Sequence, residues 1–143
     1  MNSTMKAIVQ TQYGSPEVLQ LVDVKKPEPA DNEVLVRIHA TTVTATEAVF
    51  RQGKPYFSRL FTGFRKPKIQ TLGEELAGEV IATGKDVTTL KIGDHVFGTA
   101  GPNFGANAEY LCVPEDEVLA YKPSNLTRSE ERRVGKECFL LCR

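Results

Sequence analysis

The chain has 143 residues, and its 18 Lys and Arg are balanced by 18 Asp and Glu, so its formal net charge is zero. This balance gives no electrostatic sign of a nucleic-acid or membrane partner, and we expect neither. No run of about eighteen apolar residues occurs, so no transmembrane helix is predicted. The polar opening Met1–Lys6 lacks the apolar core of a signal peptide, and the three cysteines lack a C-x-x-C spacing. Both features favour a cytoplasmic location.

Short strands separated by Gly and Pro dominate the pattern along the chain. Residues 33–39 alternate, with Val34, Val36 and Ile38 on one face of a predicted half-buried strand and Leu35, Arg37 and His39 on the other. Residues 77–82 and 108–113 are predicted to form further short strands. We therefore expect a mainly β fold, a partly open barrel with one or two short helices.

One segment has the pattern of a short helix. Residues 44–51 contain Ala and other helix-compatible residues, and Gly53 follows as a natural stop. Either Thr44 or Thr46 could cap the start of this helix, because a Thr hydroxyl can accept from a backbone N–H of the first turn. The sequence leaves the choice between the two open.

The segment LGEELAGEV at residues 72–80 is the most informative of the chain. It resembles the G-H-E-x-x-G-x-V segment of the medium-chain dehydrogenase/reductase superfamily, in whose zinc-dependent members the His binds the catalytic metal. Glu74 occupies the His position here. Upstream, TVTATE at residues 42–47 resembles V-x-C-x-[ST]-D, so Thr44 stands in place of the Cys ligand. Zinc favours Cys and His, with carboxylates as minority ligands, so the resemblance implies a zinc-free member.

Further segments agree in order along the chain. They are MKAIV at 5–9, PEP at 27–29, EVLVRI at 33–38, KIGDHV at 91–96 and GANAEY at 105–110. The resemblance covers about residues 5 to 127 and is greatest to the quinone oxidoreductase, or zeta-crystallin-like, branch. It implies that residues 1–127 form a GroES-like catalytic domain of a two-domain reductase.

The resemblance also implies a function and a missing part. Family members transfer hydride from NADPH or NADH, here to a quinone or an activated enone or carbonyl, and the full-length parent is expected to be a homodimer. NADPH would be bound mainly by a Rossmann domain that follows this point. No G-x-G occurs in the chain, so we expect that domain to be missing and the fragment alone to be inactive.

The resemblance assigns candidate site residues. Thr46 falls where family members place a hydroxyl against the substrate oxygen, and it is the catalytic candidate. Thr44 and Ala45 are candidates for contact with the cofactor. Tyr56 and Phe61, in a variable aromatic segment, are candidates for the wall of a small-molecule substrate cleft. No metal ligand is predicted.

Each assignment has an alternative. Thr44 and Thr46 could serve only as helix caps, and Glu74 with Glu75 could form a structural pair. The aromatic and basic residues between 56 and 68 could be a nucleic-acid patch instead of a cleft wall. At the level of function, the alternative is a non-catalytic barrel, either a co-chaperonin-like binding module or an inactive superfamily member.

The C-terminal segment is unusual. Residues 128–138, RSEERRVGKEC, match one reading frame of a common DNA-sequencing adapter at all eleven positions, whereas residues 139–143 remain unexplained. A natural helix beginning at Ser129 is the alternative. We interpret residues 128–143 as a non-native tail and exclude them from the domain.

This interpretation predicts that cutting the chain after Thr127 leaves its stability unchanged within about 0.5 kcal/mol, the usual scale for changes away from packed structure. Urea denaturation of the 143-residue and 127-residue chains measures the difference. A loss above about 2 kcal/mol would show that the tail belongs to the folded domain.

Overall fold

The computed structural model describes residues 4–117 and 119–122; the predicted boundary after Thr127 and the tail lie outside the described residues. The strands are β1 (Thr4–Gln10), β2 (Leu19–Lys25), β3 (Glu33–Thr41), β4 (Glu75–Thr83), β5 (His95–Thr99), β6 (Tyr110–Pro114) and β7 (Leu119–Tyr121). The helices are α1 (Ala45–Gln52) and α2 (Arg59–Thr62), with short 3₁₀ turns η1 (Pro16–Val18), η2 (Tyr56–Ser58) and η3 (Gly101–Asn103). Neither helix of the described ranges has the length and apolarity needed to cross a membrane.

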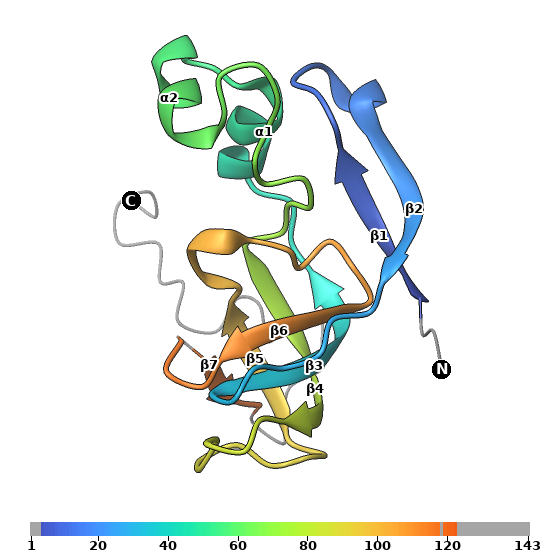
Figure 1. The fold of residues 1–143 in the computed structure, drawn as a ribbon, viewed down its shortest axis with the longest axis vertical. Coiled ribbons are helices and arrows are strands. Elements are labelled where there is room, and N and C mark those ends of the chain that lie inside the picture. Colours follow the sequence, from blue (N-terminus) through green and yellow to red (C-terminus); the bar gives the residue numbers. More distant parts are fainter. Residues whose placement is uncertain (1–3, 118, 123–143) are drawn as a thin grey trace, which may run out of the picture.

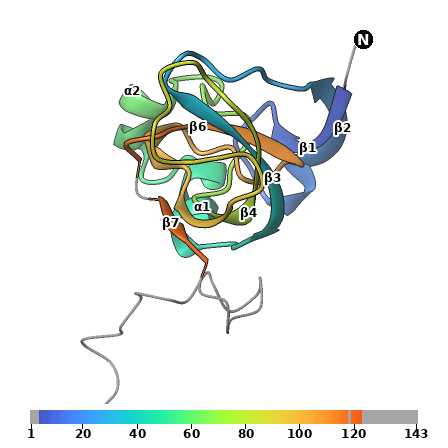
Figure 2. The ribbon, with the colours of Figure 1, turned by 90° about the horizontal axis from the view of Figure 1, so that it is seen from below.

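Five strands form the main sheet, in the order β6-β3-β4-β5-β7, and every neighbouring pair is antiparallel. The sheet curves around one interior without closing, as the view in Figure 2 shows. The hairpin β1–β2 forms a separate sheet along one side, and α1 and α2 sit beyond one end of the barrel (Figure 1). The predicted fold class, a mainly β, partly open barrel with short helices, is confirmed.

The core fills the interior of the main sheet. Its buried members come from every strand of that sheet except β7 and from the connecting loops: Val34, Val36, Leu76, Val80, Leu90, Val96, Ala100, Ala106 and Val113. Small and β-branched side chains suit a strongly curved sheet, because they pack closely on a pleated surface.

The strand at residues 33–39 is confirmed, but its predicted half-buried alternation is only partly right. Val34 and Val36 are fully buried as predicted, yet Leu35 between them is only 5% exposed. The β3–β4 register shifts between Leu35 and Val36, which breaks the two-residue period at this point. The alternation of the sequence could not reveal the burial of Leu35, since the register shift depends on the partner strand β4.

Helix α1, Ala45–Gln52, lies within one residue of the predicted range 44–51, and the structure decides which Thr caps it. Thr44 has an extended backbone, and its hydroxyl accepts from the backbone N–H of Glu47, so Thr44 is the cap. Gly53 ends the helix in the left-handed region at φ 62°. The ring of Phe50 packs against the buried ring of Phe104 at 5.0 Å between centroids, which fixes the helix on the end of the barrel.

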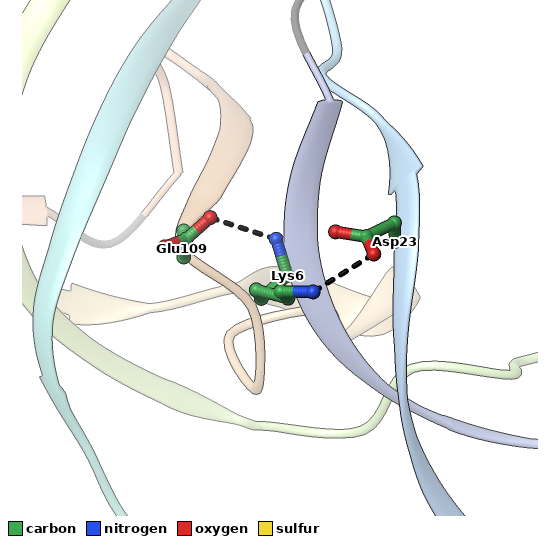
Figure 3. Close-up of polar contacts among 3 residues, drawn as sticks. All are labelled: Lys6, Asp23 and Glu109. Carbon is green, nitrogen blue, oxygen red and sulfur yellow. Dashed lines mark hydrogen bonds and ion pairs between the residues drawn. The ribbon is translucent and has the colours of Figure 1, made fainter.

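The hairpin is tied to the main sheet through the loop before β6. Ile8 N donates to the carbonyl of Asn107 at 2.9 Å, and Glu109 N donates to the carbonyl of Lys6 at 3.0 Å. Figure 3 shows Lys6 between two carboxylates: its backbone N–H donates to Glu109, and its ammonium pairs with Asp23 on β2 at 2.8 Å. The loop at residues 105–109 is therefore held from the hairpin side.

Gly73 allows the segment before β4 to approach the same loop. Its φ is 106°, and a Cβ at this position would lie 2.3 Å from the backbone nitrogen of Asn107. The close approach lets Asn107 N donate to the carbonyl of Leu72 and Ala106 N donate to the carbonyl of Gly73. Only glycine fits both the conformation and the space.

We expect Gly73→Ala to be much more destabilising than Gly93→Ala. Gly93 also has a positive φ, 94°, but an added Cβ there meets nothing within 4 Å. Gly93→Ala should therefore cost on the order of 1–3 kcal/mol from backbone strain alone, and Gly73→Ala about 1–3 kcal/mol more from the clash. Urea denaturation of the two variants measures both, and equal costs would contradict this assignment.

Glu115 joins the end of β6 to the loop before β5. Its carboxylate accepts from the backbone N–H groups of Thr88, Thr89 and Leu90 and from the Thr89 hydroxyl. These hydrogen bonds, with those from Thr89 first, lower the pKa of Glu115 from 4.5 to about 2. The contacts favour the charged form, so the carboxylate stabilises the fold only while it is ionised.

The stabilisation by Glu115 should therefore be complete above pH about 4.5 and disappear as the pH falls towards about 2. Glu115→Gln should lower the urea midpoint at pH 7, and its difference from the parent chain should shrink over that window. The exposed neighbour Asp116 provides the control. Asp116→Asn should change neither the urea midpoint at pH 7 nor the way that this midpoint depends on pH. A difference that is the same at pH 7 and pH 2.5 would refute the assignment.

Candidate functional site

The candidate site lies where the end of β3 meets the start of β4. Because the strands are antiparallel and Thr41 pairs with Leu76, the loop after β3 runs beside the segment before β4. This places Thr44 against Glu74, and the Thr44 hydroxyl donates to Glu74 Oε2 at 3.3 Å. The two positions that resemble metal-ligand positions in zinc enzymes are thus joined directly by a hydrogen bond.

Glu47 is the buried charge of the site. It lies in the first turn of α1 and is only 3% exposed. Its Oε1 accepts from the backbone N–H of Glu74 at 3.3 Å, and its Oε2 accepts from the side-chain amide of Asn107 at 3.2 Å. These donors compensate for the loss of water around the carboxylate.

Asn107 links this group to the end of β3. Its side-chain oxygen accepts from the Thr41 hydroxyl at 3.4 Å, and the same hydroxyl donates to the carbonyl of Glu75 at 2.8 Å. Four segments therefore meet in one polar network: the end of β3, the start of α1, the start of β4 and the loop before β6. We call Thr41, Thr44, Glu47, Glu74 and Asn107 the polar network.

The catalytic and cofactor candidates occupy the outer side of this network. Ala45 and Thr46 are the first two residues of α1, and both are exposed. Thr44 is half-buried and carries the cap, so the Thr46 hydroxyl is not required for that purpose. The structure joins Thr44 to Glu74, and Ala45 and Thr46 follow Thr44 in the first turn of α1. The roles assigned to these three residues stay predictions.

The substrate candidates lie in the helical segment that follows α1. Tyr56, in η2, is 67% exposed, and the guanidinium of Arg59 stacks over its ring at 4.8 Å. Arg59 also stacks over Tyr13 at 4.5 Å and donates to the carbonyl of Gly53. Tyr56 thus belongs to an exposed aromatic and basic surface. Phe61 is part of α2, but its side chain lies outside the described side chains.

A groove of about 320 Å³ lies between the hairpin and the main sheet. Thr41 and Asn107 of the polar network contribute to its lining, with Ile8, Leu21 and Ile38 as its largest apolar side chains. Thr44, Thr46 and Tyr56 are not part of this lining. Two members of the polar network thus border the groove, whereas the exposed start of α1 does not.

The residues at the two ligand-like positions do not fit a zinc ion. Thr44 offers a neutral hydroxyl that already caps α1 and donates to Glu74 Oε2, and Glu74 offers only a carboxylate, which is a minority ligand of zinc. In the described ranges, no three His, Cys, Asp or Glu side chains converge on a possible metal position. Structural and catalytic zinc sites take three or four ligands, with Cys and His preferred.

Cys112, on β6, does not have the properties of a nucleophile. Burial, followed by the nearby charge of Glu33, raises the pKa of its thiol to about 11. A thiol with this pKa stays protonated at neutral pH, whereas the thiolate is the reactive form. Its half-buried position in the strand suits the role of a small apolar residue.

Sequence reasoning missed three residues of the polar network, Thr41, Glu47 and Asn107. A signal for Glu47 was present, since Thr44-x-x-Glu47 has the spacing of a capping box. That pattern would have sent the carboxylate back to its own helix, whereas the structure turns it towards β4 and the loop before β6. For Asn107 the sequence holds no such signal, because its partner lies 60 residues away.

Comparison with known proteins agrees with this geometry. Residues 30–124 match the alcohol dehydrogenase GroES-like domain family. The chain is 35% identical to a pig quinone oxidoreductase over 140 residues, 96% of the chain and 40% of that protein. It is 35% identical to an *Arabidopsis thaliana* chloroplastic NADPH-dependent alkenal/one oxidoreductase over 130 residues, 85% of the chain and 32% of that protein.

Among solved structures, a *Coxiella burnetii* quinone oxidoreductase is similar, with a TM-score of 0.80 and 34% identity over 92% of the chain and 41% of that structure. The chain thus spans about 40% or less of the length of these proteins. The matched domain and the barrel agree: the chain belongs to the alcohol dehydrogenase GroES-like domain family of the medium-chain dehydrogenase/reductase superfamily.

Proposed function

We propose that this chain is the substrate-side domain of an NADPH-dependent reductase that delivers hydride to a quinone or an activated enone without zinc. The observation that carries the proposal is the hydrogen bond between Thr44 and Glu74, the residues at the two ligand-like positions. The exposed Thr46 lies two residues after Thr44. The names of the pig and *Arabidopsis* relatives, a quinone oxidoreductase and an NADPH-dependent alkenal/one oxidoreductase, support the substrate class.

The chemistry explains why a metal is not required. A conjugated acceptor takes up hydride more readily than a simple carbonyl does, and the negative charge that develops on its oxygen is smaller and more dispersed. A hydroxyl donor aimed at that oxygen can stabilise the charge. In our proposal Thr46 is this donor, and the Glu47 and Glu74 contacts keep its turn of α1 in place.

The cofactor would be held only partly by this chain. The described strands are antiparallel, so they do not form the parallel β-α-β unit that binds a dinucleotide pyrophosphate. Thr44 and Ala45 at the start of α1 fit a limited contact with the cofactor through backbone N–H groups, because the Thr44 hydroxyl already donates to Glu74. NADPH, when bound, supplies the hydride.

We predict that the chain, or a longer protein that contains it, holds no stoichiometric zinc. The physical reason is the absence of a suitable ligand set at Thr44 and Glu74, since a neutral hydroxyl is a poor zinc ligand. Elemental analysis after dialysis against a mild chelator measures the content. A content of about one zinc per chain would contradict the prediction. The matched control is the double variant Thr44→Cys/Glu74→His, which restores the Cys and His of the zinc-dependent enzymes at these two positions.

We further predict that Thr46→Val, in the longer protein, lowers kcat for a quinone or enone about tenfold. A strong oxyanion donor is worth on the order of 3 kcal/mol, and a threonine at an exposed position should give about 1–2 kcal/mol. NADPH affinity should change less than about twofold. Thr46→Ser retains the hydroxyl and should retain most of the rate.

A melting curve must accompany these kinetics. Because Thr44 already caps α1, Thr46→Val should leave the melting temperature within a few degrees of the parent. An unchanged kcat would show that Thr46 has no catalytic role. An unchanged kcat together with a large loss of stability would show that Thr46 instead stabilises the helix.

A further inference from the structure

Glu47 makes contacts that a simple helix cap does not explain. In a capping box the acidic residue three positions after the cap reaches back to the backbone of its own helix. Here both carboxylate oxygens extend to other segments, Oε1 to the N–H of Glu74 and Oε2 to the amide of Asn107. The first turn of α1 is therefore attached to the start of β4 and to the loop before β6.

These attachments fix the turn because each partner is itself held. Asn107 N donates to the carbonyl of Leu72, and its carbonyl accepts from Ile8 N on the hairpin. Glu74 is fixed in turn, since its carbonyl accepts from Ala100 N at 2.7 Å. A carboxylate that is only 3% exposed is costly to leave without donors, so the arrangement around Glu47 is strongly preferred.

Thr46 precedes Glu47 in the same helical turn. Its side chain is exposed and it lies next to the fixed residue, so the position of its hydroxyl follows the position of that turn. Donors to a developing oxyanion are effective only when they are held in place before the reaction, and a displacement of about 1 Å is costly in rate.

We infer that Glu47 is a positioning residue, which holds the Thr46 hydroxyl in register with the substrate oxygen by joining α1 to β4 and to Asn107. The inference rests on the proposed function, because it gives Glu47 an effect on rate only through Thr46. It differs from a purely structural role in one respect: the kinetic effect of Glu47 must vanish once the Thr46 hydroxyl is absent.

The variants follow from the hydrogen-bond chemistry. Glu47→Met retains the length of the side chain but offers no acceptor to Glu74 N or to the Asn107 amide. Glu47→Gln retains one acceptor for Glu74 N and, if the Asn107 amide turns over, a second hydrogen bond to that residue. Glu47→Gln is therefore the conservative variant that should rescue most of the function.

The experiment is a double-mutant cycle in the longer reductase, with kcat and KM measured for menadione as the quinone and NADPH as the donor, well below the melting temperature. Glu47→Met should lower kcat about five- to tenfold, with about tenfold as the ceiling set by loss of the Thr46 hydroxyl. In a Thr46→Val background the same substitution should change kcat less than about twofold. Glu47→Gln should stay within about threefold of the parent.

Three results would overturn the inference: an unchanged kcat for Glu47→Met, an equal loss with and without the Thr46 hydroxyl, or no rescue by Glu47→Gln. If Glu47→Met does not fold, Asn107→Ala removes one donor to Glu47 and must show the same dependence on Thr46. The Thr46→Val parent separates the two proposals. A normal kcat in that variant would contradict both the catalytic role of Thr46 and the positioning role of Glu47. With a low kcat in that variant, the kinetics of the Glu47 variants decide the positioning role.

Discussion

The antiparallel pairing of β3 with β4 is the constraint on which the site depends. Thr41 at the end of β3 pairs with Leu76 near the start of β4, so the residues that follow one strand lie beside those that precede the other. Thr44 and Glu74 are 30 positions apart in sequence, yet this register brings them within hydrogen-bond distance. The right register is enforced by burial, because a one-residue slip would turn Val34 and Val36 out of the core.

The hairpin β1–β2 lies outside the main sheet but contributes to the same site. It holds the loop at residues 105–109 through Ile8 and Lys6, while Gly73 lets that loop approach from the other side. Asn107 is thereby fixed by backbone hydrogen bonds on both sides before its side chain meets Glu47. The rigidity of the polar network thus comes from the barrel and the hairpin together.

The site also shows how one scaffold can support different chemistry. A metal at the start of β4 would stabilise negative charge on a substrate oxygen as a Lewis acid. Glu74 places a carboxylate there instead, and the Thr44 hydroxyl is its neighbour. A carboxylate opposes an oxyanion, so any stabilisation of that charge has to come from neutral donors such as the exposed start of α1. In the proposed function, this requirement favours substrates whose reduced form spreads the negative charge over a conjugated system.

The sequence by itself determined the fold class, the strands β3, β4 and β6, helix α1 with its end at Gly53, and the replacement of the metal-ligand residues by Thr44 and Glu74. These features are local, since alternation, capping residues and ordered motifs depend on near neighbours. Only the tertiary structure decided that Thr44 rather than Thr46 is the cap, that Leu35 is buried, and that Glu47 binds Glu74 and Asn107. Those outcomes depend on the register of β3 with β4 and on contacts between residues 27 to 60 positions apart, which no local pattern encodes.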